Sequence, residues 1–211
     1  MIRYAYYVVK KIDKRKHVML TAMEKQILRK NLEKYEGRIE HMYKDTKGFI
    51  TVGVGHLIKD LTAAQAQDFI HQTTNKKSTK EEIKIDFESV KKSPAGLFAS
   101  IYKNRTKLKL TPSTIDKITN KNIDDFESEL KRLYGAVEFT QFPSEVKLAL
   151  FDMIFNLGMT KLRNGFPNFS KSIKAKDWNK AANESNRLDI ALARNKYVKE
   201  LLNKAAKSTK P

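Results

Sequence analysis

The segment that most constrains the fold is residues 142–158, which read FPSEVKLALFDMIFNLG. A helix drawn through this segment is apolar on nearly every face, and such a helix is stable only when other elements cover it on all sides. Pro143 suits the first turn of a helix, and Gly158 suits the position where a helix ends. The sequence therefore predicts a central buried helix around which the rest of the chain packs.

Capping residues and a helical spacing of apolar side chains predict further helices on both sides of this one. Thr21 and Glu24 have the spacing of a capping box, and Gly37 is placed to end the helix that follows. The other expected helices follow the capping pairs Thr62–Gln65 and Ser78–Glu81, begin at Pro112, and cover 123–133, 176–185 and 193–207.

One short region has the pattern of β-strands. Residues 41–56 contain apolar residues alternating with glycines, and Lys47-Gly48 marks a hairpin turn. Residues 1–10 could add a further strand or form a loose arm. We predict an α+β fold that is predominantly α-helical, with a basic arm or strand at 1–20 and one domain over 21–211. A small β lobe at about 36–60 and a helical lobe would flank a cleft.

Charge narrows the range of partners. The chain carries a formal net charge of +18, and 16 of those charges come from residues 1–31 and 161–211. Such ends favour a polyanion, which could be nucleic acid, an anionic membrane or an acidic wall polymer.

There is no cysteine for a disulfide or a thiol nucleophile. The sequence has no metal-binding or nucleophile motif, no transmembrane segment and no recognisable signal peptide, so we expect no metal or cofactor and delivery by other machinery.

The hairpin region also contains a candidate pair of catalytic carboxyls. Glu36 lies at the expected end of a helix, Asp45 opens the hairpin turn, and Thr51 enters the next strand. An inverting glycoside hydrolase needs a protonated carboxyl and a second carboxylate about 6.5–9.5 Å away, with a water molecule between. A threonine hydroxyl both donates and accepts hydrogen bonds, so Thr51 could help to hold that water. Gly53 and Gly55 would let a polysaccharide approach the backbone closely.

The full string is more specific than the spacing of two acids. The pattern E-x8-D-x5-T within YEG, YKDTKG and TVGVGH resembles the signature of phage-type lysozymes, glycoside hydrolase family 24. The resemblance implies a lysozyme-like two-lobe fold with Glu36 as the general acid. It implies Asp45 as the carboxylate that activates water or stabilises the cationic transition state, and Thr51 as the partner of Asp45. The implied reaction is inverting hydrolysis of the β-1,4 bond after N-acetylmuramic acid in peptidoglycan, which lyses the cell wall.

Similarity to this family continues downstream. ALFDMIFNLG resembles the family's central helix, and ALARNKYV resembles the segment whose arginine pairs with the catalytic glutamate. The resemblance implies substrate contacts at four positions and supporting roles at two. The substrate-contacting positions are Gly55, Leu57, Phe155 and Asn156, with core packing as the alternative for Phe155. The supporting ones are Arg194, with a solvent-facing helix cation as the alternative, and His56, which would brace the hairpin by hydrogen bonding. Trp178 is expected in the core.

A charged arginine stabilises the ionised form of a neighbouring carboxyl, whereas a general acid needs its proton. Arg194 therefore either loosens its contact with Glu36 when sugar binds, or occupies another position.

Extra sequence before Glu36 and between the hairpin and residue 123 resembles the longer, pesticin-like branch of the family, which includes bacteriocins and secreted effectors. This branch implies a monomer that acts on peptidoglycan at the cell wall, in the periplasm of a target cell. A cognate immunity or inhibitor protein is a further expected partner. The alternative functions are a non-catalytic wall-binding protein and a nucleic-acid-binding protein.

Overall fold

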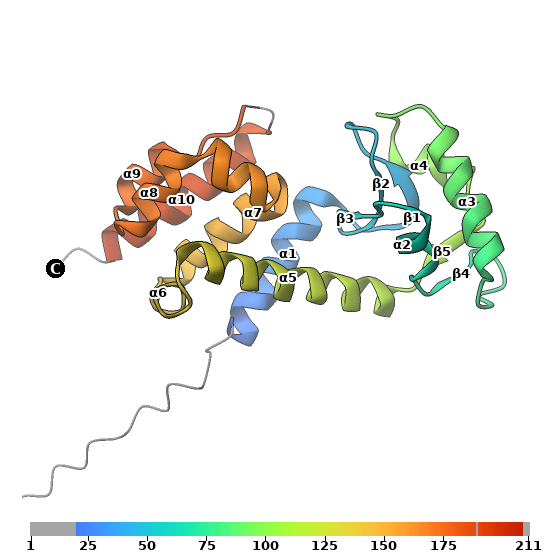
Figure 1. Ribbon diagram of the computed structural model, residues 1–211, viewed down its shortest axis with the longest axis horizontal. Helices are drawn as coiled ribbons and strands as arrows, with labels where there is room; N and C mark the ends of the chain where they lie inside the picture. Colours follow the sequence, from blue (N-terminus) through green and yellow to red (C-terminus); the bar gives the residue numbers. More distant parts are fainter. Residues whose placement is uncertain (1–19, 189, 209–211) are drawn as a thin grey trace, which may run out of the picture.

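The computed structural model describes residues 20–188 and 190–208. Helices dominate, and the strands are short (Figure 1). The helices are α1 (Ala22–Glu36), α2 (Leu61–Gln65), α3 (Lys80–Lys92), α4 (Ala99–Lys103), α5 (Pro112–Tyr134), α6 (Ala136–Gln141), α7 (Ser144–Gly165), α8 (Pro167–Lys174), α9 (Trp178–Asn183) and α10 (Leu192–Ser208). The strands are β1 (Ile39–Lys44), β2 (Ile50–Gly53), β3 (His56–Leu57), β4 (Phe69–His71) and β5 (Leu108–Leu110). The predicted α+β class is confirmed.

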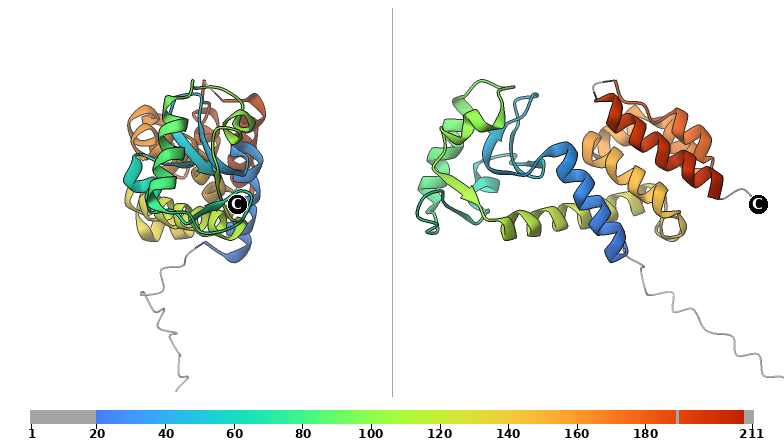
Figure 2. Two further views of the ribbon diagram at one scale, coloured as in Figure 1. Left: turned by 90° about the vertical axis from the view of Figure 1, so that its right-hand side faces the viewer. Right: turned by 180° about the vertical axis from the view of Figure 1, so that it is seen from behind.

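These elements form two lobes (Figures 1 and 2). The strands gather at one end together with α2, α3 and α4, and α6 to α10 form the other end. The long helix α5 runs alongside both lobes, and α1 lies between them. The smaller lobe thus includes elements up to Leu110, beyond the expected hairpin region. The division of the chain into an arm at 1–20 and a catalytic domain at 21–211 stays a prediction, and residues 1–19 lie outside the described part.

The predicted hairpin is confirmed. β1 and β2 pair antiparallel with Tyr43 opposite Thr51, and β3 extends the sheet in the order β1-β2-β3. At the turn, the backbone N–H of Asp45 donates to the carbonyl of Phe49 at 2.9 Å, and the N–H of Gly48 donates to the carbonyl of Asp45 at 3.0 Å. These bonds fix where the side chain of Asp45 leaves the hairpin.

The predicted central helix is α7, and it is buried as expected. Its residues from Val146 to Ile154 are all buried, and it packs against α1, α5, α8 and α10. Gly158 has φ +71° and ψ 163°, so the helical path breaks there and resumes as a second segment to Gly165. The glycine therefore ends the apolar segment, and the bend directs the next turns of α7 toward the space between the lobes.

The start of α1 is also as predicted, because Thr21 and Glu24 form a capping box and Gly37 ends the helix with φ +75°. The capping pair Thr62–Gln65 was a wrong prediction. Asp60 caps α2 by accepting from the N–H of Ala63, and the helix stops at Gln65.

Helix α3 begins one residue later than expected, with the capping box formed by Thr79 and Glu82. The two helices expected around 112–133 are one helix of 23 residues, with Pro112 in its first turn as predicted.

A second sheet was missed, in which β4 and β5 pair with Phe69 opposite Leu110. The buried carboxylate of Asp86 on α3 accepts from the N–H groups of Lys107 and Leu108, and this fixes β5 at its start. The contact between Asp86 and β5 joins residues that are distant in the sequence, so the sequence does not reveal it. The strands β4 and β5 have only three residues each, which is too short for a recognisable alternating pattern. Among the described residues, no helix is long and apolar enough to cross a membrane.

Candidate active site

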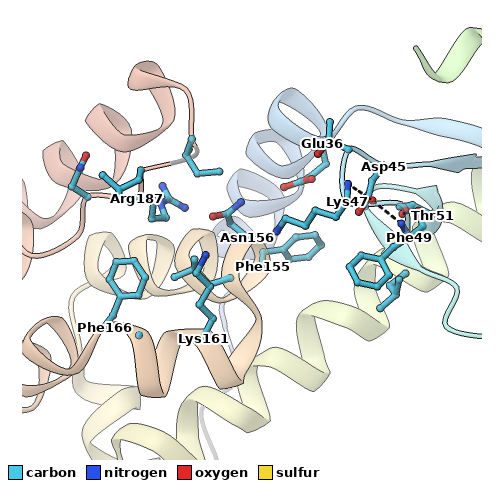
Figure 3. Close-up of a pocket in the computed structure, with 18 of the residues that line it drawn as sticks. Glu36, Asp45, Lys47, Phe49, Thr51, Phe155, Asn156, Lys161, Phe166 and Arg187 are labelled. Carbon is cyan, nitrogen blue, oxygen red and sulfur yellow. Dashed lines mark hydrogen bonds between the residues drawn. The ribbon is translucent and has the colours of Figure 1, made fainter. Parts of the chain in front are cut away.

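A cavity of about 710 Å³ lies between the lobes (Figure 3). Its walls come from the end of α1, the β1–β2 hairpin, α7 and the segment between α9 and α10. All seven residues predicted to be catalytic or to contact substrate line it: Glu36, Asp45, Thr51, Gly55, Leu57, Phe155 and Asn156. Residues 119 positions apart in the sequence, Glu36 and Phe155, are thereby brought to one surface.

Asp45 is held by the backbone of its own turn. Its Oδ1 accepts from the N–H of Lys47 at 2.9 Å and from the N–H of Phe49 at 2.8 Å. No group in the described part of the chain donates a hydrogen bond to its Oδ2. One carboxylate oxygen of Asp45 is therefore fixed, and the other is available to a water molecule or a substrate.

Glu36 is the last residue of α1, and Arg194 of α10 holds it from the helical lobe. Arg194 Nη1 donates to Glu36 Oε1 at 2.7 Å, so the predicted pairing is confirmed. The second oxygen, Oε2, receives no hydrogen bond from any described residue and lies next to Gly55. A Cβ at Gly55 would come 3.2 Å from Oε2, and the backbone there has φ +64°. The sequence TVGVGH therefore folds the β2–β3 turn directly against the glutamate.

A buried network of charges stands behind Glu36. Asp152 of α7 accepts from Arg194 Nε at 3.0 Å and from Arg187 Nη1 at 2.8 Å. The side chains of Asp152 and Arg187 are 4% and 2% exposed, so these charges must compensate one another. Burial works against the charged form of Arg194, but Asp152 and Glu36 outweigh it and raise the pKa of Arg194 above its ordinary value. The guanidinium of Arg194 also lies over the ring of Tyr35, 5.1 Å from its centroid.

Two side chains with hydroxyl groups, Thr51 and Tyr43, line the cavity from the β1–β2 hairpin. Thr51 is buried, lines the cavity and donates from Oγ1 to the carbonyl of Phe49 at 3.3 Å. Tyr43 lies opposite Thr51 in the sheet. Burial, together with the charges of Glu36 and Asp45, raises the pKa of Tyr43 to about 12. Tyr43 therefore stays a neutral phenol that can donate a hydrogen bond inside the cavity.

The remaining predicted residues have structural contacts of their own. Phe155 packs edge-on against Phe126 with ring centroids 5.3 Å apart, although it also lines the cavity. His56 contacts the side chain of Asn122 on α5, so it ties β3 to that helix. The space beside Gly53 is filled by Ile115, whose side chain would lie 3.5 Å from an added Cβ. Trp178 is 4% exposed and belongs to the core, as expected.

Sequence reasoning missed four charged residues near the site. Asp152 and Arg187 form the network behind Glu36, and Lys47 and Lys161 line the cavity. An aspartate within the otherwise apolar segment ALFDMIFNLG is the one signal that pointed to the network, because a buried charge requires a partner. Nothing in the sequence indicated that the two lysines face one cavity.

Comparison with known proteins agrees with the geometry. A probable T4-type lysozyme of Dictyostelium discoideum is 30% identical to this chain over 161 residues, which cover 74% of this chain and 79% of that protein. The chain belongs to the T4-type lysozyme family. Within this family it falls in the pesticin-like branch, because residues 99–179 match the family described as "Pesticin: Bacterial toxin homologue of phage lysozyme, C-term".

Proposed function

We propose that this protein is a muramidase that hydrolyses the β-1,4 bond between N-acetylmuramic acid and N-acetylglucosamine in bacterial peptidoglycan. The observation that supports this most directly is that Glu36 and Asp45 line one cavity and each has a carboxylate oxygen without a hydrogen-bond donor in the described part of the chain. Membership of the lysozyme family supports the same class of reaction.

In this proposal, Glu36 is the general acid. Arg194 binds Oε1, so Oε2 is the oxygen that carries the proton and donates it to the leaving glycosidic oxygen. A protonated carboxyl still accepts a hydrogen bond at its carbonyl oxygen, so the contact with Arg194 need not break. Asp152 also pairs with Arg194, so Glu36 is not the only carboxylate that compensates the charge of this arginine.

Asp45 is the general base in this mechanism. Its Oδ1 is held by two backbone N–H groups, and Oδ2 takes a proton from a water molecule as that water attacks the anomeric carbon. Thr51 lies on β2, the strand that follows the turn, and it lines the same cavity, where its hydroxyl can orient the water. Attack from the face opposite the leaving group would invert the configuration at that carbon.

The substitution Glu36→Gln tests the proposal, because glutamine keeps the contact with Arg194 but cannot donate the proton. We expect digestion of purified sacculi to fall by about 10²–10⁴-fold, the usual contribution of general acid catalysis. The matched control is Glu40→Gln, which changes an exposed glutamate of β1 outside this cavity. Undiminished digestion by Glu36→Gln in a folded protein would refute the assignment.

Mass analysis of the released fragments tests the bond, and NMR of fresh product tests the stereochemistry. We expect a reducing end at muramic acid and the inverted anomer. If the starting anomer is retained, Asp45 acts as a nucleophile instead.

We further propose that the protein acts in the periplasm of a target cell and that other machinery delivers it there. We also propose that it is a monomer and that an immunity protein binds it. The family matches do not favour the polyanion-binding alternative.

A further inference from the structure

Two lysines enter the cavity from its opposite walls (Figure 3). Lys47 comes from the β1–β2 turn, and its side chain extends toward Asn156 on α7. Lys161 lies on α7 beyond the break at Gly158, and its side chain points into the same space. Both lysines are exposed, so a molecule in the cavity can reach them.

Neither ammonium group has a partner in the described part of the chain. Within residues 20–188 and 190–208, no carboxylate pairs with Lys47 or Lys161, and neither lysine side chain makes a hydrogen bond. Arg187, the other cation that lines the cavity, is paired with Asp152. Among the described residues, the two lysines are therefore the cations of this cavity without an ion-pair partner.

The lysines do not serve the carboxyls of the proposed mechanism. Asp45 is held by backbone N–H groups and Glu36 by Arg194, so both are positioned without either lysine side chain. Two unpaired cations on facing walls instead favour an anionic group on the bound molecule. The sugar rings of peptidoglycan are neutral. The lactyl carboxyl of a muramic acid that carries a peptide forms the amide bond to that peptide, so the free carboxylates of such strands lie on the peptides.

We propose that Lys47 and Lys161 select glycan strands by the carboxylates carried on their muramic acid residues. This inference rests on the proposed muramidase function and names the part of the substrate that the cavity recognises. The inference predicts that the carboxylates attached to the glycan strand, and not the sugar chain alone, determine how tightly the substrate binds in the cavity. Because both lysines are exposed, salt should weaken this selection.

The test compares native sacculi with sacculi whose carboxylates have been converted to neutral amides. We expect the amidated substrate to show a raised KM with wild-type protein and a similar kcat. Lys47→Met and Lys161→Met should each raise KM on native sacculi by about fivefold, as expected for a partly exposed ion pair. The double variant should treat native and amidated sacculi alike. Methionine preserves the apolar stem of lysine, and Lys180→Met on the exposed face of α9 is the matched control.

A peptide-free glycan, in which removal of the peptide has freed the lactyl carboxyl, tests where the carboxylate must lie. If its KM matches that of native sacculi, a carboxylate next to the sugar ring is enough for recognition. If its KM matches that of amidated sacculi, the carboxylates of the peptide are required. Equal KM values for native and amidated sacculi with wild-type protein would overturn the inference.

A binding assay separates this inference from the proposed function. Glu36→Gln should sediment with native sacculi more than with amidated sacculi, and high salt should remove the difference. Charge-dependent binding together with absent digestion by wild-type protein would disprove the muramidase but keep the selection. Digestion without charge dependence would disprove the selection alone.

Discussion

The two walls of the cavity hold their carboxylates by different means. On the hairpin wall, formed by β1, β2 and their turn, Asp45 is fixed by N–H groups two and four residues further along the chain. Behind the helical wall, formed by α7 and the segment between α9 and α10, Asp152 is fixed by arginines 35 and 42 residues away. One arrangement is local and partly exposed, and the other is long-range and buried.

Because of this difference, substitutions on the two walls should affect different properties of the protein, its folding stability on one wall and its catalysis on the other. The hairpin turn is held by bonds between backbone groups and by backbone N–H groups that donate to Asp45 Oδ1, a role that an uncharged amide oxygen can also fill. The helical wall depends on charges removed from water, where loss of one partner leaves the others uncompensated. We therefore expect the same chemical change to affect folding on one wall and catalysis on the other.

The largest effect on stability is expected from Asp152→Asn. Arg187 would then have no carboxylate partner among the described residues, and Arg194 would keep only Glu36. Breaking such a buried pair costs about 3–5 kcal/mol of unfolding free energy. Chemical denaturation measures this loss. The matched control is Asp125→Asn, which removes an exposed pair with Lys121 on α5 and should cost at most about 0.5 kcal/mol. If both variants lose the same amount, Asp152 is not what holds the helical wall together.

A smaller loss is expected from Gly55→Ala, at the point where the two walls meet. Alanine at φ +64° costs about 1–2 kcal/mol, and its methyl group would lie 3.2 Å from Glu36 Oε2 and displace that oxygen. Gly96→Ala is the control, because Gly96 has φ +74° with no atom within 4 Å of an added Cβ. Both variants should lose similar stability, whereas only Gly55→Ala should lose wall digestion. Equal activity in the two variants would show that the position of Oε2 is not critical.

These contacts also explain which features of the structure could be predicted from the sequence. The capping box of Thr21, the turn at Asp45 and the end of α1 were predictable because each depends on residues within four positions. The pairing of Arg194 with Glu36 was expected only through family resemblance, since 158 residues separate them. An aspartate in an apolar segment indicated that Asp152 needs partners, but which residues these are depends on how distant elements pack together. The same holds for the second sheet, so no local pattern could indicate either pairing.

Asp45→Asn is expected to change stability by no more than about 1 kcal/mol, because the amide oxygen can still accept from Lys47 and Phe49. Digestion of sacculi should nevertheless fall by about 10²-fold or more, since an amide is a poor base. Together with Asp152→Asn, this variant makes the same substitution on both walls. A large loss of stability in Asp45→Asn would mean that its charge, and not its backbone hydrogen bonds, holds the turn.

The smallest effect is expected from mild acid, and it should act on the hairpin lobe. Burial lowers the pKa of His41, despite its hydrogen bond to the carbonyl of Ala99, and burial also lowers that of His56 beside Asn122. Both histidines are therefore neutral when folded, and they take up protons more readily once unfolded. The unfolded chain then gains protons as the pH falls below about 6.5, so stability is complete above that pH and declines below it. Unfolding free energies measured on both sides of pH 6.5 should differ in wild-type protein and differ less in the double variant His41→Gln/His56→Gln. If the variant keeps the whole pH dependence, other titrating groups cause it, and the two buried histidines do not make the hairpin lobe sensitive to acid.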